Sequence, residues 1–194
     1  GGDSSIGIYT DVAAINNTNT INVGTDGIGI YATASGKAVK NDNMTMTGDN
    51  GIGVYIKGAT GGLTANNITS TGGKGNTGLV LDGTTSSSLP LYINAGTITL
   101  GDESIGVMAT GTTSSPITIA GTITVGDSGT GKSAIGIVAS GGSDVILAGT
   151  TEIKAGKGGI GVYAEGAGTT VAGINASNIT VGTDGIYLYS TVGT

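Results

Sequence analysis

The stretch Gly24-Thr25-Asp26-Gly27-Ile28-Gly29-Ile30-Tyr31 returns, with variation, along the whole length of this 194-residue chain. Its second half, Ile-Gly-Ile-Tyr or a close relative, recurs every 22 to 30 residues, at positions 6–9, 28–31, 52–55, 77–80, 105–108, 135–138, 160–163 and 186–189. A period in this range is typical of repeat architectures, in which each repeat is one structural unit. We therefore expect one elongated domain over residues 1–194, without a separate second domain.

The composition excludes two other glycine-rich classes of protein. The chain contains 40 glycines, two prolines and no Cys, His, Trp or Phe. Collagen needs glycine at every third position, which this sequence does not have. Disordered chains are poor in aliphatic residues, whereas Ile, Val and Leu recur here in register. The core is therefore expected to be aliphatic, divided into small layers and free of disulfides.

Each repeat contains three strand-like runs. The Ile-Gly-Ile-Tyr run is followed by a short apolar run, as at 13–15, 63 and 117–119, and by a third run that ends just before a glycine, as at 21–23, 98–100 and 123–125. These units predict an all-β fold, a single-stranded right-handed parallel β-helix (β-solenoid) with three short strands per turn and about seven turns. An antiparallel sandwich is the rival fold, but it would not need the same residue type at the same place in every unit.

Strand alternation predicts which side chains face the core. If Ile28 and Ile30 point inward, then Gly29 and Tyr31 point outward. The interior would then contain a column of isoleucines from successive turns: Ile6, Ile28, Ile52, Ile105, Ile135 and Ile160.

Two short motifs resemble signatures of catalysis. Residues 126–133, Gly-Asp-Ser-Gly-Thr-Gly-Lys-Ser, satisfy the P-loop pattern, and residues 126–129 match the Gly-Asp-Ser-Gly of chymotrypsin-like serine proteases. A P-loop needs a helix directly after it, whereas the repeat strand 134–138 follows here. The protease mechanism needs a histidine, and the chain has none. We expect neither activity.

Acidic residues give no clear site. Asp102 and Glu103 are adjacent, so on a strand they would face opposite ways, and no column of acids supports glycosidase chemistry. The turns at Asp49 and Asp127 lack the nonapeptide of calcium-binding β-rolls. We therefore expect no catalytic residue, no cofactor, no metal site and no enzyme activity. A β-helix carbohydrate-active enzyme remains an alternative, and would need acids from neighbouring turns to converge in a groove.

Nucleic acid is not an expected partner. The formal net charge is −6 and the seven lysines are scattered, whereas a phosphate-binding face needs clustered basic residues. No apolar run approaches the length of a membrane span. The sequence starts Gly1-Gly2-Asp3 and shows no secretory signal, which predicts either the mature portion of a secreted protein or a fragment cut from a longer one.

Five tyrosines occupy one position of the repeat and form the candidate binding surface: Tyr9, Tyr31, Tyr55, Tyr163 and Tyr189. They are expected to line one outer edge, which Val80, Met108 and Val138 continue. Rings in such a column cover exposed strands beside glycines. They also provide a platform for sugars or a protein partner.

Threonine and asparagine also align, on the outward positions of the third run. A flat Thr-x-Thr array resembles ice-binding solenoids, which gives an alternative function. Glu152 and Lys154 interrupt the array, and hydrogen-bonded side-chain ladders explain the pattern equally well. Insertions at 82–90, 111–116 and 127–132 lengthen two repeats and are expected to project as loops, where function often resides.

Two segments carry a family resemblance. Residues 20–31, Thr-Ile-Asn-Val-Gly-Thr-Asp-Gly-Ile-Gly-Ile-Tyr, and residues 178–189, Asn-Ile-Thr-Val-Gly-Thr-Asp-Gly-Ile-Tyr-Leu-Tyr, resemble the passenger repeats of bacterial type V autotransporters. They look most like those of the fusobacterial RadD-like outer-membrane adhesins. The resemblance extends over essentially the whole chain at the level of the repeat, and it brings no catalytic residue.

The resemblance implies an extracellular β-helix on the surface of a Gram-negative bacterium. The full-length protein would be anchored in the outer membrane by a C-terminal β-barrel that is not in this sequence. The implied function is adhesion, with a passenger fragment that mediates or presents attachment to host or partner cells. The partner would be a cell-surface protein or glycan. The strand edges at the two ends of such a fragment also predict self-association.

Overall fold

The computed structural model describes residues 2–33, 37–58, 60–83, 91–113 and 116–191, which form two parallel sheets. Sheet A contains, in spatial order, β1 (Ile6–Thr10), β3 (Ile28–Thr33), β5 (Ile52–Lys57), β7 (Thr77–Asp82), β9 (Ile105–Thr110), β11 (Ile135–Ser140), β14 (Ile160–Glu165) and β17 (Ile186–Ser190). Sheet B contains β2 (Ile15–Val23), β4 (Val39–Met46), β6 (Leu63–Ser70), β8 (Leu91–Thr99), β10 (Ile117–Val125), β12 (Asp144–Leu147), β13 (Glu152–Ala155), β15 (Thr170–Ala172) and β16 (Ile179–Val181).

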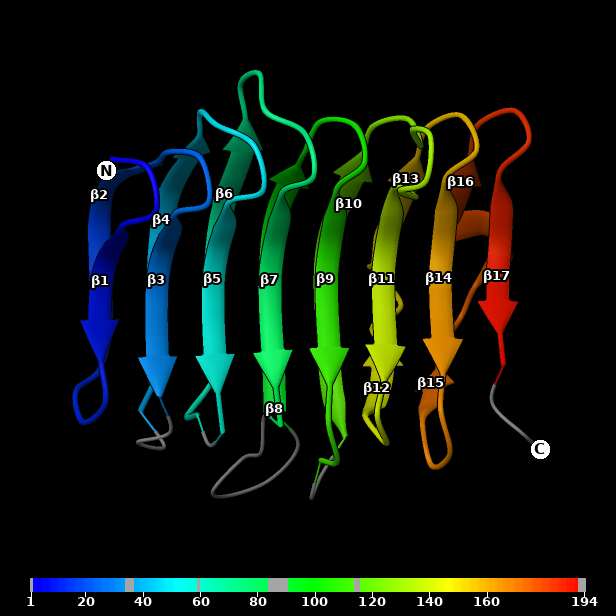
Figure 1. Ribbon diagram of the computed structural model, residues 1–194. Coiled ribbons are helices and arrows are strands. Elements are labelled where there is room, and N and C mark those ends of the chain that lie inside the picture. The colour runs from blue at the N-terminus through cyan, green and yellow to red at the C-terminus, as the bar shows by residue number, and fades with distance from the viewer. Residues whose placement is uncertain (1, 34–36, 59, 84–90, 114–115, 192–194) are drawn as a thin grey trace.

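The chain coils through the two sheets in turn. In Figure 1, the strands of sheet A run downward in front, those of sheet B run upward behind, and each turn lies to the right of the one before it. This arrangement is a right-handed coil. Each strand of sheet A pairs in parallel with its counterpart one turn later, as Tyr9 does with Tyr31. The predicted parallel β-solenoid of about seven turns is therefore confirmed.

The second and third runs of each repeat join into one long strand in the first five turns. The register of these strands shifts between Asn17 and Thr20 in β2 and between Ala120 and Thr122 in β10. Gly96 and Gly121 have positive φ angles at this bend, +51° and +132°, which other residues rarely adopt. In the next two turns the long strand divides, first into β12 and β13 and then into β15 and β16.

The motif glycines face the core, so the predicted orientation of the Ile-Gly-Ile-Tyr run is wrong at its first two residues. A Cβ atom on Gly29 would lie 2.5 Å from Cε of Met44 in sheet B and 2.7 Å from the carbonyl oxygen of Gly53. Gly29 and Ile30 are both buried, whereas Ile28 is half-exposed. Two successive residues thus face inward because the third run of sheet B approaches the backbone of sheet A too closely for any side chain.

The interior column therefore comes from the second aliphatic residue of each motif. Its fully buried members are Ile30, Val54, Leu79, Val107, Ile137 and Val162. The predicted column of first isoleucines lies on the outer surface instead, where Ile6 is 48% exposed and only Ile160, at 8%, is buried. Facing the interior column, sheet B contributes Met44, Ile68, Ile98, Ile123 and Ile153, each at most 1% exposed.

The corner before each strand of sheet A is a tight turn stacked on its neighbours. In the turn 24–27 the Gly27 amide donates to the Gly24 carbonyl at 3.2 Å. Asp26 has a φ angle of +54°, which fits a type II turn. The Asp26 amide then donates to the carbonyl of Asp49 one turn later at 2.9 Å. Equivalent positions in other turns also have positive φ angles: Ser4, Asn50, Gly75, Glu103, Gly158 and Asp184.

The glycine constraint predicts a large and specific loss of stability on adding one methyl group. In Gly106→Ala the new Cβ would lie 2.5 Å from the carbonyl oxygen of Gly136 and would also overlap Ile123. We expect the free energy of unfolding to fall by about 1–3 kcal/mol, measured by urea denaturation. Gly149→Ala is the matched control, because no atom lies within 4 Å of its Cβ position, and its effect should stay within about 0.5 kcal/mol. Equal midpoints for the two variants would contradict the steric account.

Candidate binding surface on the outer face of sheet A

The five candidate tyrosines lie in one column on the outer face of sheet A. Strand register places Tyr9 beside Tyr31 and Tyr31 beside Tyr55, and it pairs Tyr163 with Tyr189. The predicted alignment of these residues is confirmed, while their role in binding stays a prediction. Between the two groups the column continues through Val80, Met108 and Val138.

The rings contact each other within each group. The ring centroids of Tyr9 and Tyr31 are 5.6 Å apart, and those of Tyr31 and Tyr55 are 5.1 Å apart in an edge-to-face arrangement. Tyr163 and Tyr189 stack nearly parallel at 5.1 Å. These are favourable aromatic geometries, so the rings stabilise neighbouring turns while their outer edges remain open to a partner.

Carboxylates hold two of the tyrosine hydroxyl groups. Tyr55 donates to Oδ2 of Asp82, and Tyr163 donates to Oε2 of Glu165, both at 2.7 Å. Burial, then the hydrogen bond to Asp82 and the charge of that carboxylate, raise the pKa of Tyr55 to about 12. The hydrogen bond to Glu165, with smaller contributions from burial and charge, raises the pKa of Tyr163. Both hydroxyl groups therefore stay protonated at neutral pH, and each donates its hydrogen bond to the neighbouring carboxylate.

A second apolar column, which the sequence analysis missed, runs beside the tyrosines. It is formed by the first residue of each motif, in register from strand to strand: Ile6, Ile28, Ile52, Thr77, Ile105, Ile135, Ile160 and Ile186. The sequence signal was the isoleucine that directly precedes the motif glycine in six of the eight repeats. It could be interpreted only after the glycine was known to face inward. No described element lies in front of this face in Figure 1.

Lys132, the last residue of the insertion at 127–132, lines a groove on this face. The groove has a volume of about 450 Å³ and is floored by Ile105, Ile135 and Ile160, with Tyr163, Glu103 and Lys132 also lining it. Of the three predicted loops, this is the one that lies wholly within the described residues. The loop at 82–90 is described only at 82–83 and the loop at 111–116 lacks 114–115, so most of the first and the centre of the second lie outside the described residues.

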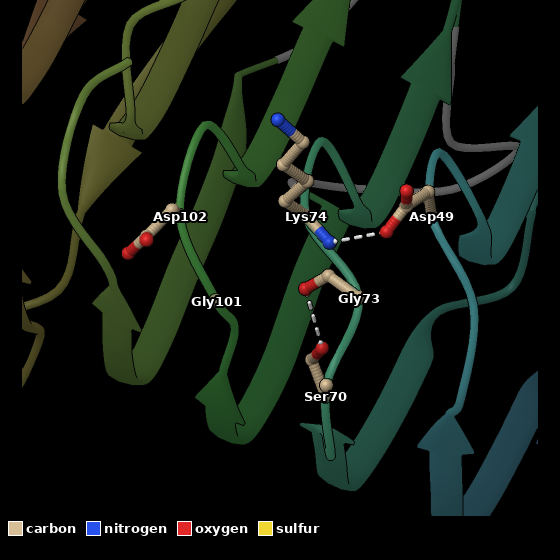
Figure 2. Close-up of a pocket in the computed structure, with 7 residues that line it drawn as sticks. Asp49, Ser70, Gly73, Lys74, Gly101 and Asp102 are labelled. Carbon is tan, nitrogen blue, oxygen red and sulfur yellow. Dashed lines mark hydrogen bonds between the residues drawn. The ribbon is translucent and has the colours of Figure 1, made fainter.

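A second depression, of about 460 Å³, lies at the turn corner (Figure 2). Gly73 and Gly101 leave it open, and Asp49, Asp102 and Lys74 line it. Oδ1 of Asp49 accepts the amide of Lys74, and Oδ1 of Asp102 accepts the amide of Asp127, both at 2.9 Å. In Figure 2 both carboxylates point toward the following turn and not toward each other. This geometry suits the stacking of turns and does not form a facing pair of acids.

The P-loop-like segment 126–133 and the protease-like segment 126–129 both lie in the connection between β10 and β11. Strand β11 follows the P-loop-like segment, so no helix N-terminus is available to hold phosphate. The hydroxyl of Ser128 donates to the Gly158 carbonyl at 2.8 Å and accepts the Ala134 amide at 2.9 Å. Oδ1 of Asp127 accepts the amide of Lys157 at 2.7 Å. These side chains therefore fasten the insertion to the adjacent turns.

The predicted threonine and asparagine columns are confirmed on the outer face of sheet B. One column contains Thr45, Thr69, Thr99 and Thr124 in direct register. The parallel column contains Asn43 and Asn67, whose side chains hydrogen-bond at 3.1 Å, followed by Thr97 and Thr122. The exposed pair of Glu152 and Lys154, 3.5 Å apart, interrupts both columns.

Within the ranges that the structure describes, no group of three or more acidic, His or Cys side chains is placed to hold a metal ion. No described helix is long and apolar enough to cross a membrane. Comparisons with protein-family models, with curated proteins and with solved structures found no match to this chain.

The tyrosine–carboxylate contact predicts a specific change in titration. In Asp82→Asn the negative charge is lost while burial remains, so the pKa of Tyr55 should fall from about 12 toward 10.0. In the unchanged protein this raised pKa stabilises the fold fully below about pH 10, and the contribution is lost as the pH rises to about 12. NMR titration of the tyrosine ring signals measures both effects. Glu165→Gln is the control that should shift Tyr163 alone, and an unchanged Tyr55 midpoint in Asp82→Asn would refute the assignment.

Proposed function

We propose that this chain is a segment of a surface-displayed adhesin passenger that mediates or presents attachment to host or partner cells. The observation that carries the proposal is the outer face of sheet A, where the isoleucine and tyrosine columns make a long apolar and aromatic surface on a stiff rod. Large exposed apolar surfaces mark sites of interaction, and tyrosines suit interfaces because each ring is apolar with a polar tip. The likeness of the repeats to autotransporter passengers supports the same function.

The parallel coil suits this function because it forms a long rod along which the same surface residues recur. Strands in a sheet lie about 4.8 Å apart, so the seven steps along sheet A extend about 34 Å. The same residue types return at every step, which offers a partner several equivalent contacts, and multivalent contacts raise avidity without a new type of contact. The proposed location is extracellular, on the surface of a Gram-negative bacterium, with the full-length protein anchored in the outer membrane.

A competition assay tests this proposal. The purified chain, added to bacteria that display the full-length protein, should block their attachment to host or partner cells in a dose-dependent manner. Tyr31→Ala combined with Tyr55→Ala should weaken blocking, because the two rings contact each other on the proposed face. Tyr92→Ala is the matched control, since Tyr92 is 54% exposed but belongs to β8 in sheet B.

Two outcomes of this assay would count against a binding face on sheet A of this segment. If the folded chain does not block attachment at any concentration, this segment has no binding face. If Tyr92→Ala weakens blocking as much as the double variant does, the tyrosines of sheet A are not the contact surface.

Ice binding is a second candidate, favoured by the threonine columns of sheet B. Four threonines stand in direct register on consecutive turns, at positions 45, 69, 99 and 124. Asparagines in the parallel column and the pair of Glu152 and Lys154 break the regular array. Thermal hysteresis separates the two functions: the adhesin proposal expects none above that of an equal concentration of albumin, and a clear hysteresis would establish ice binding.

We also propose that the chain associates end to end. Ile6 and Tyr9 at one end of the coil and Ile186, Leu188 and Tyr189 at the other are all at least 40% exposed. The two ends carry the same motif, so β17 of one copy can continue onto β1 of another, a head-to-tail contact that builds filaments. Sedimentation velocity should show a mass that rises with concentration, and a monomer at every concentration would exclude this association.

A further inference from the structure

The groove on sheet A has a continuous aliphatic floor that runs along the rod. Ile105 pairs with Ile135, and Ile135 pairs with Ile160, on consecutive strands. With strands about 4.8 Å apart, the three side chains span about 10 Å. Tyr163, from the same strand as Ile160, also lines the groove. The floor is therefore apolar and ends in an aromatic ring on its C-terminal side.

The insertion places a positive charge at the opposite end of the floor. The Lys132 ammonium group lies 3.4 Å from Oδ1 of Asn50 and 3.6 Å from the position that a Cβ of Gly75 would take. Backbone hydrogen bonds align Asn50 and Gly75 with Glu103 and Ser128 of later turns. The insertion and the Lys132 side chain together thus extend back about three turns along the rod, to the level where Thr77 replaces isoleucine in the column.

This ammonium group has no anionic partner in the described structure. The three ion pairs among the described residues do not include Lys132, and its hydrogen bond is to a neutral amide oxygen. The nearest lining carboxylate, Glu103, is paired with Lys74 at 3.4 Å and is mostly buried. The Lys132 side chain is exposed. The groove therefore presents an apolar floor with one uncompensated positive charge at its N-terminal end.

The chemistry of the lining favours a peptide over a glycan. A glycan presents many hydroxyl groups that need hydrogen-bond partners, and an unpaired polar group loses free energy on burial. Here the Tyr163 hydroxyl is held by Glu165, and Glu103 is held by Lys74. In an extended peptide, side chains at i and i+2 lie on one face about 7 Å apart. Two apolar side chains therefore fit the floor, and a carboxylate at i+4 reaches toward Lys132.

We infer that this groove binds an extended segment of a protein partner, with two alternate apolar side chains on Ile105, Ile135 and Ile160 and a carboxylate on Lys132. Binding of such a segment is independent of where the chain is displayed. That the partner belongs to another cell rests on the proposed function.

Methyl-labelled NMR with defined peptides tests the inference directly. The probes are acetyl-Leu-Thr-Leu-Thr-Asp-amide and its reversed sequence, acetyl-Asp-Thr-Leu-Thr-Leu-amide, because the direction of the segment is open. At least one should shift the δ1-methyl signals of Ile105, Ile135 and Ile160 and leave the buried Ile68 signal unchanged. The same peptide with Asn in place of Asp should bind more weakly by up to about fivefold, the upper end of the range of an exposed ion pair.

Variants of the chain identify the charge that the peptide uses. Lys132→Ala should weaken binding of the Asp peptide by the same factor and leave binding of the Asn peptide unchanged. Lys157→Ala is the matched control, since Lys157 is exposed in the next turn and does not line the groove. Ile135→Ser should weaken the binding of both the Asp peptide and the Asn peptide. Circular dichroism and the Ile68 signal report whether each variant is folded.

The outcomes separate this inference from the proposed function. An equal loss of affinity for the Asp peptide in Lys132→Ala and Lys157→Ala would overturn the inference. So would methyl shifts that an oligosaccharide panel produces and the peptides do not. Absence of binding by every probe would also overturn it. Peptide binding at the groove without any block of cell attachment would support the groove and reject this segment as the surface that mediates attachment.

Discussion

The close approach of sheet B to the backbone of sheet A at each motif glycine is the constraint on which the rest of the structure depends. The aliphatic side chains of the third run occupy the space that a Cβ would need, and the backbone of the next turn lies on the other side. Only glycine permits both contacts. Because the glycine and the residue after it both face inward, the coil stays narrow and the residue before the glycine is turned outward.

This constraint has a direct consequence for the surface. An alternating strand would have hidden the first isoleucine of each motif and shown the glycine. The break in alternation instead places isoleucine on the outside, beside the tyrosine column, so the core and the candidate binding face are made by the same steric requirement. The outer isoleucines then form a hydrophobic column whose members lie one strand spacing apart, and an insertion in one turn is enough to convert part of it into a groove.

Polar groups at the corners lock the turns in register. Carboxylates of Asp3, Asp49, Asp102 and Asp127 each accept an amide from the following turn. The residue that follows three of these acids has a positive φ angle: Ser4, Asn50 and Glu103. The amide of each donates a hydrogen bond to a backbone carbonyl of the next turn. These acids are therefore structural elements of the coil. The ammonium of Lys132, by contrast, lies beside Asn50 of a much earlier turn. The groove therefore has a charged end and an apolar end along the rod.

The sequence by itself determined the repeat, the parallel β-solenoid and the alignment of the tyrosines and threonines, because each depends only on the period with which residue types return. It also excluded a working P-loop, since the residues after Lys132 belong to a strand pattern. What it could not determine was the direction in which Ile28 and Gly29 point, because alternation is a local rule and the contact that breaks it comes from Met44 in the other sheet. The groove was beyond sequence analysis for a related reason. It joins residues from four turns, and the reach of Lys132 to Asn50, 82 positions away, exists only once those turns are stacked.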